Sequence, residues 1–234
     1  MSDENKLPSY KDYAKWKMSV NDWGEFFALT DDEAQEIAAQ FQTSGLDISN
    51  AKVLEIGFGS GKVLRWFHDN ECSVEGVEIQ EHLIQLAREK NFKAFRNISE
   101  CDGPYDLIIG LDVLEHMTLD QLKDLFDHAS QKLSPSGKML FRFPNADSYA
   151  GLAAQNGDYT HITAIGQSKL RQIIEPHGFV IESFVGRVDY PVRRIRNGLI
   201  KIIRWPMIKI IGFGNPYFFD ANLVAVIKRT SGER

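Results

Sequence analysis

From about residue 51 onward, the apolar positions along the chain alternate between two spacings. Short continuous apolar runs, typical of strands buried on both faces, are followed by segments with apolar residues three and four positions apart, typical of helices. The strand-like runs cover residues 52–56, 73–79, 92–96, 106–111, 138–143, 178–186 and 221–229. The helical segments cover residues 61–70, 81–90, 118–133 and 167–177.

Strands that alternate with helices predict an α/β fold with a mostly parallel sheet and right-handed crossovers. We therefore expect one Rossmann-like domain over residues 51–234, with seven strands and helices on both faces. Two inserts interrupt the alternation, at 144–166 and 187–220. Because open α/β sheets bind ligands beyond the carboxyl ends of their strands, the first insert is expected to border a bound ligand.

The first 50 residues are expected to form an N-terminal helical cap. Thr30 is a typical residue to start a helix, and the apolar residues of the segment 31–43 recur on one helical face. The helix would either fold over a ligand as a lid or cover an edge of the sheet. Both alternatives remain open at this point.

Composition and charge narrow the class of protein. The net charge of −5 disfavours general nucleic-acid binding. The two cysteines, Cys72 and Cys101, lack zinc-ligand spacing, so we expect no metal site, no disulfide framework and a reducing compartment. The polar start of the chain has no signal-peptide pattern, and no apolar run is long enough to span a membrane. We expect a cytoplasmic protein.

The most informative segment is the strand that runs into a glycine-rich turn, at residues 53–61. The dinucleotide fingerprint G-x-G-x-x-G requires a glycine where the chain has Lys62 or Leu64. The phosphate-binding pattern G-x-x-x-x-G-K-[ST] fails at Ile56 and Val63. A glycine-rich turn still allows close approach of a ligand to the backbone, although it can also occur without any ligand.

The remaining pattern is E-x-G-x-G-x-G, formed by Glu55, Gly57, Gly59 and Gly61. It resembles motif I of the class I S-adenosylmethionine (SAM) methyltransferases. The resemblance implies that the turn wraps the amino-acid end of SAM, with Glu55 near the ammonium group. It also implies S-adenosylhomocysteine as the product. In this family an N-terminal helix often forms a lid over the cofactor. The resemblance also implies that the last strand of the sheet is antiparallel to its neighbours.

Glu78 ends the next predicted strand, about 20 residues after the turn, where a carboxylate accepts hydrogen bonds from both ribose hydroxyls. Ile79 would then pack on the adenine. A solvated Glu78 at the strand end is the alternative. Asn97 occupies the position at which many relatives carry an aspartate facing the adenine amino group, and its side-chain carbonyl retains the ability to accept a hydrogen bond.

The segment from Asp106 to His116 resembles a third methyltransferase motif, D-x-I-x-x-x-D-V-L-E-H, and matches each of its defined positions. The resemblance implies that Asp112 holds the methionine end of SAM, directly or through water. His116 is expected to order its loop or to contact the cofactor.

Residues 143–146, 157–161, 170–174 and 178–179 resemble a subgroup of these enzymes encoded with bacterial surface-polysaccharide enzymes. The subgroup implies O-methylation of a sugar hydroxyl or phosphate on a small-molecule or glycan acceptor. His161 lies in its G-D-Y-T-H motif. It is interpreted as a catalytic base, as a donor that positions the acceptor, or as a structural loop residue.

Two further functions remain as alternatives: a non-catalytic SAM-fold partner of another methyltransferase, and a small-molecule or quinone methyltransferase. The second insert carries a basic amphipathic segment at 192–209. This segment predicts contact with an anionic ligand or peripheral association with the inner membrane. A helix packed on the domain or a homodimer contact is the other interpretation.

Overall fold

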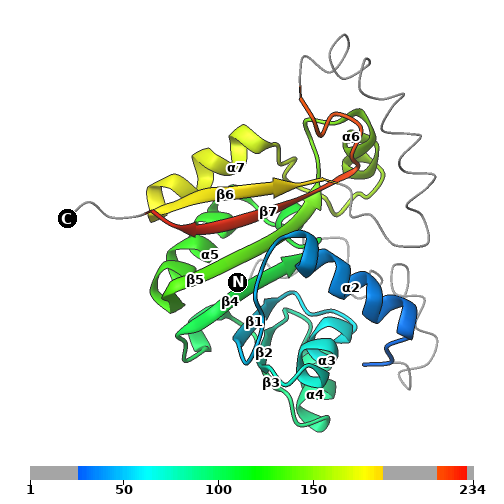
Figure 1. The fold of residues 1–234 in the computed structure, drawn as a ribbon, viewed down its shortest axis with the longest axis vertical. Helices are drawn as coiled ribbons and strands as arrows, with labels where there is room; N and C mark the ends of the chain where they lie inside the picture. The colour runs from blue at the N-terminus through cyan, green and yellow to red at the C-terminus, as the bar shows by residue number, and fades with distance from the viewer. Residues whose placement is uncertain (1–25, 187–214, 231–234) are drawn as a thin grey trace, which may run out of the picture.

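The computed structural model describes residues 26–186 and 215–230 and shows one seven-stranded sheet (Figure 1). The strand order is β3-β2-β1-β4-β5-β7-β6. Strands β3 to β5 are parallel, and β7 is antiparallel to both of its neighbours, as expected for this fold. The strands are β1 (Lys52–Ile56), β2 (Ser73–Val77), β3 (Lys93–Phe95), β4 (Tyr105–Leu111), β5 (Leu133–Pro144), β6 (Phe179–Val185) and β7 (Asn222–Arg229).

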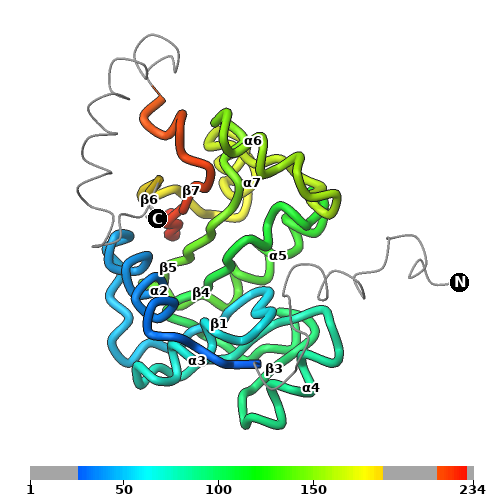
Figure 2. The backbone as a smooth tube through the Cα atoms, turned by 90° about the vertical axis from the view of Figure 1, so that its right-hand side faces the viewer, coloured from blue at the N-terminus to red at the C-terminus, as the bar shows by residue number. Residues whose placement is uncertain are grey.

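Helices cover both faces of the sheet. Figure 2 shows α2 and α3 on one side of the central strands and α5 and α7 on the other. The α-helices are α2 (Asp31–Thr43), α3 (Lys62–Asp69), α4 (Glu81–Glu89), α5 (Leu119–Lys132), α6 (Tyr149–Asn156) and α7 (Gln167–Ile174). Single 3₁₀ turns are η2 (Ile98–Glu100), η3 (Leu114–His116) and η4 (Glu175–His177).

The apolar runs form strands because consecutive side chains point to opposite faces and each face has its own core. On β1, Val53 packs into the cluster beneath α2 and α3, whereas Leu54 packs into the cluster beneath α5 and α7. Helix α2 is held to this layer by Phe41, whose ring lies 5.3 Å from that of Trp66 and 5.0 Å from that of Phe67. Full burial of each such side chain contributes about 1.5–3 kcal/mol.

The insert at 144–166 contains a helix that the sequence pattern did not predict. Ser148 caps α6 by accepting a hydrogen bond from the Gly151 amide, and the helix has little amphipathic character. Strand β5 also begins earlier than predicted, because Leu133 pairs with Tyr105 before the Pro135 turn. Helix α6 lacks a clear helical period in its apolar positions, and the earlier start of β5 depends on pairing with a distant strand.

Most of the second insert, including the segment 192–209, lies outside the described residues. The same is true of residues 1–25 of the predicted N-terminal cap. The last residues of the second insert, 215–220, are described and pack beneath the first insert. The Asn145 side-chain amide donates to the carbonyl oxygens of Tyr217, at 3.0 Å, and Asp220, at 3.2 Å. Within the described residues, no helix has the length and apolar character needed to cross a membrane.

The close packing of β2 against α3 gives a test of the fold. A Cβ atom added at Gly76 would meet Cδ1 of Phe58 at 2.6 Å and Cδ1 of Leu64 at 3.1 Å. We expect Gly76→Ala to lower the free energy of unfolding by about 1–3 kcal/mol, because the strand must shift to accept the methyl group. Chemical denaturation measures this change, and an unchanged midpoint would contradict the packing described.

Candidate active site

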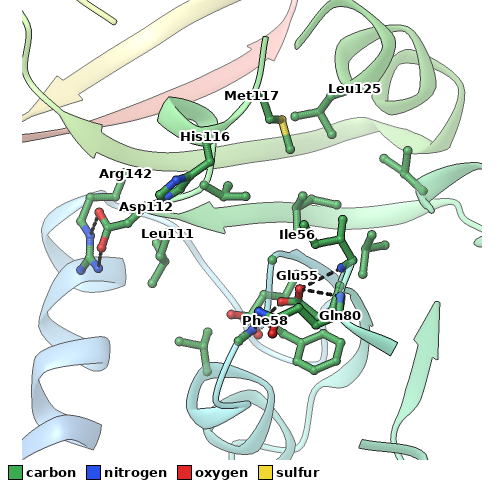
Figure 3. Close-up of a pocket in the computed structure, with 18 of the residues that line it drawn as sticks. Glu55, Ile56, Phe58, Gln80, Leu111, Asp112, His116, Met117, Leu125 and Arg142 are labelled. Atoms are coloured by element: carbon green, nitrogen blue, oxygen red, sulfur yellow. Dashed lines mark hydrogen bonds and ion pairs between the residues drawn. The ribbon is translucent and has the colours of Figure 1, made fainter. Parts of the chain in front are cut away.

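A cavity of about 920 Å³ lies at the carboxyl ends of the parallel strands (Figure 3). Its wall is formed by the loops that follow β1, β2 and β4, together with one face of α2. This volume lies within the range of natural ligand pockets and near its upper end. The cavity therefore provides room for more than one small molecule.

The glycine turn forms the floor of the cavity, with Gly57, Gly59 and Gly61 all at positive φ. A Cβ atom at Gly57 would meet Val113 at 2.8 Å, and one at Gly61 would meet the Phe27 ring at 2.6 Å. At Gly59 nothing lies within 4 Å of such an atom. Gly57 and Gly59 line the cavity, whereas Phe27 covers Gly61.

Glu78 connects this turn to the end of β2. Its buried carboxylate accepts hydrogen bonds from the amides of Gly59 at 3.1 Å, Ile79 at 2.8 Å and Gln80 at 3.1 Å. Burial raises the pKa of Glu78, while these amides favour the charged form. The neighbouring Ile79 side chain lines the cavity and is 55% exposed, so it offers an apolar surface to a flat ligand.

Glu55 also lines the cavity, and it is almost completely buried. Its Oε2 atom has no hydrogen-bond partner among the residues that the structure describes. Burial, together with the nearby Glu78 carboxylate, raises the pKa of Glu55 well above its ordinary value. A buried acceptor of this kind fits a cationic ligand group, which would supply the missing partner and favour ionisation.

Asp112 follows β4 with a positive φ and lies in the cavity wall. The Arg142 guanidinium donates to its Oδ1 at 2.9 Å from Nε and to its Oδ2 from Nη2. Arg142 also donates to Oε1 of Gln40 on α2, at 3.1 Å (Figure 3 shows the Asp112 pair). Sequence reasoning missed Arg142, although a charge within an otherwise apolar strand was a usable signal.

Helix α2 borders the cavity and packs on the sheet layer at the same time. Its start carries a reciprocal capping box between Thr30 and Glu33. Glu33 also accepts a hydrogen bond from Lys62 Nζ at 2.5 Å, which joins α2 to the start of α3. Ile37 and Gln40 face the cavity, whereas Phe41 packs against Trp66 and Phe67 of α3. A role of α2 as a lid over a bound ligand stays a prediction.

Asn97 lines the cavity beyond β3. Its Oδ1 accepts a hydrogen bond from the Ser99 amide at 3.0 Å and so caps η2. The carbonyl that was expected to meet an adenine amino group is thus already in use. A carbonyl oxygen has a second lone pair, so the contact with a ligand is still available.

Of the two candidate histidines, one lines the cavity and the other does not. His116 lines the cavity, and its Nδ1 lies 3.1 Å from both the carbonyl and the hydroxyl oxygen of Thr160. His161 is absent from the cavity wall, and its side chain is only 5% exposed. The two rings are 4.7 Å apart in an edge-to-face arrangement. The structure therefore places His116 at the cavity surface and His161 behind it, out of direct contact with a cavity ligand.

The reason is that the loop after α6 folds back onto the η3 turn. The amides of Ile162 and Thr163 donate to the Glu115 carbonyl at 2.7 and 3.0 Å, and the Thr163 hydroxyl donates to the Met117 carbonyl at 2.6 Å. This arrangement brings Ile162, rather than His161, into the cavity wall. The same end of the cavity is lined by Met117, Thr118, Gln121, Leu125 and His128.

The raised pKa of Glu55 predicts a pH-dependent stability. Protonated Glu55 stabilises the folded state. This stabilisation is complete below the pKa of the unfolded state, near 4.5, and is lost as the pH rises through the pKa of the folded state. For the ligand-free protein we expect Glu55→Gln to raise the melting temperature at pH 8 but not at pH 4. Each unit of pKa difference corresponds to about 1.4 kcal/mol, or to a change of roughly 3–6 °C in the melting temperature.

Glu182→Gln serves as the control, because its neighbours Lys138 and Lys228 lower the pKa of Glu182. That lowered pKa stabilises the fold above the unfolded pKa, and the stabilisation is lost as the pH falls. Glu182→Gln is therefore expected to give no gain at pH 8. Calorimetry measures the melting temperatures across the pH range. A difference in melting temperature between Glu55→Gln and wild type that stayed the same at every pH would contradict the raised pKa of Glu55.

Comparison with known proteins places these features in a family. Residues 27–183 match the family model described as a methyltransferase domain. Over 176 residues the chain is 24% identical to the mitochondrial ubiquinone biosynthesis O-methyltransferase of Mus musculus, covering 63% of this chain and 46% of the mouse protein. The chain thus spans about half the length of the curated relatives it matches.

Solved structures show the same fold at low sequence identity. A SAM-dependent methyltransferase from Archaeoglobus fulgidus matches with a TM-score of 0.61 and 19% identity, covering 84% of this chain and 94% of that one. One from Mesorhizobium loti matches with a TM-score of 0.59 and 16% identity, covering 84% and 98%. With the family match over most of its length, the chain belongs to the class I SAM-dependent methyltransferases.

Proposed function

We propose that this protein transfers the methyl group of SAM to an oxygen atom of a small hydroxylated molecule. One observation carries the proposal: a single cavity extends from the glycine turn, past Asp112, to a wall formed by His116 and Ile162. The cofactor cradle and the acceptor wall are therefore parts of one cavity. A shared cavity aligns two reactants, which is the main task of a methyltransferase.

The cofactor supplies a methyl group on a cationic sulfur, which is a good leaving group. Glu55 would lie near the ammonium group, and its buried carboxylate fits that charge. Glu78 would accept the ribose hydroxyls while continuing to hold the turn, and Ile79 would pack on the adenine. The remaining cofactor contacts would come from Gly57, Gly59, Asn97 and Asp112, with Gly61 shaping the turn beneath Phe27.

At the other end of the cavity, bound SAM would supply its methyl group to the acceptor oxygen and would be released as the neutral thioether S-adenosylhomocysteine. The hydroxyl proton of the acceptor would pass to water. His116 is the imidazole on this part of the wall, with its Nδ1 held by Thr160. It is placed to hold the acceptor hydroxyl and to favour loss of its proton.

Acceptor chemistry is suggested by the apolar side chains of Met117, Leu125 and Ile162, which line this end beside a few polar groups. Such a lining favours an aromatic or quinol-like molecule. The mouse relative is named for O-methylation in ubiquinone biosynthesis. A sugar hydroxyl or phosphate of surface-polysaccharide biosynthesis is the second candidate. This second candidate is supported by the G-D-Y-T-H sequence at 157–161. A sugar acceptor would bind at the same wall of the cavity.

An acceptor screen tests the proposed function. The full chain with SAM is offered catechols and quinols, nucleotide sugars and phosphorylated sugars, and products are identified by mass spectrometry. We expect an O-methylated phenol or quinol together with S-adenosylhomocysteine. Products from sugars alone would select the second candidate, and transfer only to nitrogen or sulfur would contradict both.

In the same assay, His116→Gln is expected to lower kcat by about 10²–10⁴-fold, because the acceptor hydroxyl loses the imidazole that assists proton loss. Affinity for S-adenosylhomocysteine should remain unchanged. His68→Gln is the matched control, since His68 is an exposed histidine on α3 away from the cavity. Equal rates for the two variants would exclude a role of His116 in the reaction.

The ribose assignment is tested by calorimetry with S-adenosylhomocysteine. We expect Glu78→Ala to weaken binding by about 1.5–3 kcal/mol, because a charged hydrogen-bond acceptor is lost. Glu81→Ala, at an exposed carboxylate in the first turn of α4, should bind as wild type does. Wild-type affinity of the Glu78 variant would show that this carboxylate only holds the turn.

A further inference from the structure

We propose that Glu115, His116 and His161 bind one divalent transition-metal ion at the acceptor end of the cavity. Composition and cysteine spacing gave no indication of such a site, and none was expected from the sequence. The role of the ion in catalysis rests on the proposed function. The binding of the ion itself depends only on these side chains and their surroundings.

The geometry brings the three residues together from two separate segments. Glu115 and His116 belong to η3, whereas His161 belongs to the loop after α6. One ligand atom from each lies within 4.8 Å of the others. Two atoms bound to one tetrahedral ion at roughly 2.1 Å are roughly 3.4 Å apart, so the ligand atoms would have to approach one another by up to roughly 1.4 Å to complete the site.

The donor set suits a first-row transition ion. Two imidazoles and one carboxylate form the kind of set that binds Zn²⁺ or other first-row ions. Three protein ligands leave at least one coordination position for another oxygen, as in catalytic sites. Because His116 lines the cavity, that position would lie on the side from which an acceptor approaches.

The surroundings of His116 match those of a metal-bound imidazole. In metal sites, the ring nitrogen that does not bind the ion usually donates to a carbonyl or carboxylate, which fixes the orientation of the ring. Nδ1 of His116 lies 3.1 Å from the Thr160 carbonyl oxygen, which leaves Nε2 for the ion. The Thr160 hydroxyl in turn donates to Asp158 Oδ1 at 2.6 Å, so the orienting residue is itself held in place.

The groups around His161 are of the kind that bind cations. Its Nε2 lies 3.9 Å from Glu115 Oε1 and 3.6 Å from Asp158 Oδ2, and these two acidic side chains are 1% and 6% exposed. Carboxylate oxygens and imidazole nitrogens are the ligand atoms that divalent transition-metal ions take in proteins. An ion held by Glu115 and His161 would also lie close to the carboxylate of Asp158.

In the reaction, the ion would bind the acceptor hydroxyl and lower its pKa. The oxygen–hydrogen bond then breaks with the electron pair left on oxygen and the proton released to water. The same pair forms the bond to the methyl carbon, and the ion keeps its charge throughout. His116 would thus act on the acceptor through the ion.

Metal binding is tested on the full chain after treatment with a chelator and dialysis. Calorimetric titration with Zn²⁺ and with Mn²⁺ is expected to show one site per chain in the wild type for at least one of the two ions. His161→Gln and Glu115→Gln should each weaken that binding at least tenfold. His177→Gln is the matched control, because His177 also pairs with a carboxylate, that of Asp127 at 2.6 Å, but lies outside the cluster.

The titration of wild type alone decides the proposal even if a variant fails to fold. Absence of a stoichiometric site for either ion, or equal affinity in folded His161→Gln, would overturn it. Fold is checked by calorimetry with S-adenosylhomocysteine, whose affinity should not change in these variants.

Turnover assays distinguish the proposed metal site from the proposed O-methylation. If chelation abolishes O-methylation and the added ion restores it, the ion has the catalytic role assigned. If metal-stripped enzyme methylates an acceptor at the full rate, that role is overturned while the proposed function stands. If the ion binds but no hydroxylated acceptor is methylated, the site stands and the acceptor class is wrong.

Discussion

The structure depends on one buried carboxylate. Glu78 accepts backbone hydrogen bonds from Gly59, Ile79 and Gln80, and so holds the turn after β1 against the turn after β2. These amides belong to two loops that side-chain packing alone would position poorly, because glycine contributes no side chain. The same carboxylate faces the cavity. One side chain therefore combines a scaffolding role with the proposed ribose contact.

The order of strands and helices was predictable because each element carries its own local signal. Apolar runs buried on both faces identified the parallel strands, and the antiparallel last strand followed from the family resemblance. The residues assigned to the cofactor were also predictable, since each lies at or just after the carboxyl end of a strand. The structure places all of these except Gly61 in the wall of one cavity, namely Glu55, Gly57, Gly59, Glu78, Ile79, Asn97 and Asp112. Helix α6 was missed because its weakly amphipathic sequence has no clear helical period.

The acceptor side was less predictable, because it depends on contacts between distant segments. His161 stands in a recognisable motif, but nothing in its local sequence shows that Ile162 and Thr163 bond to the Glu115 carbonyl and turn the imidazole inward. The grouping of Glu115 with two histidines was hidden for the same reason. Arg142 differs, since a guanidinium in a buried strand demands a partner, and Asp112 provides it.

The attachment of the insert to η3 has a consequence for how such proteins diverge. The bonds from Ile162 and Thr163 to the Glu115 carbonyl join backbone to backbone, so they do not depend on which side chain position 162 carries. Exchange of that side chain would reshape the compartment beside His116 without disturbing the framework. Related chains could in this way acquire new preferences by single substitutions, while the machinery that handles the common methyl donor stays the same.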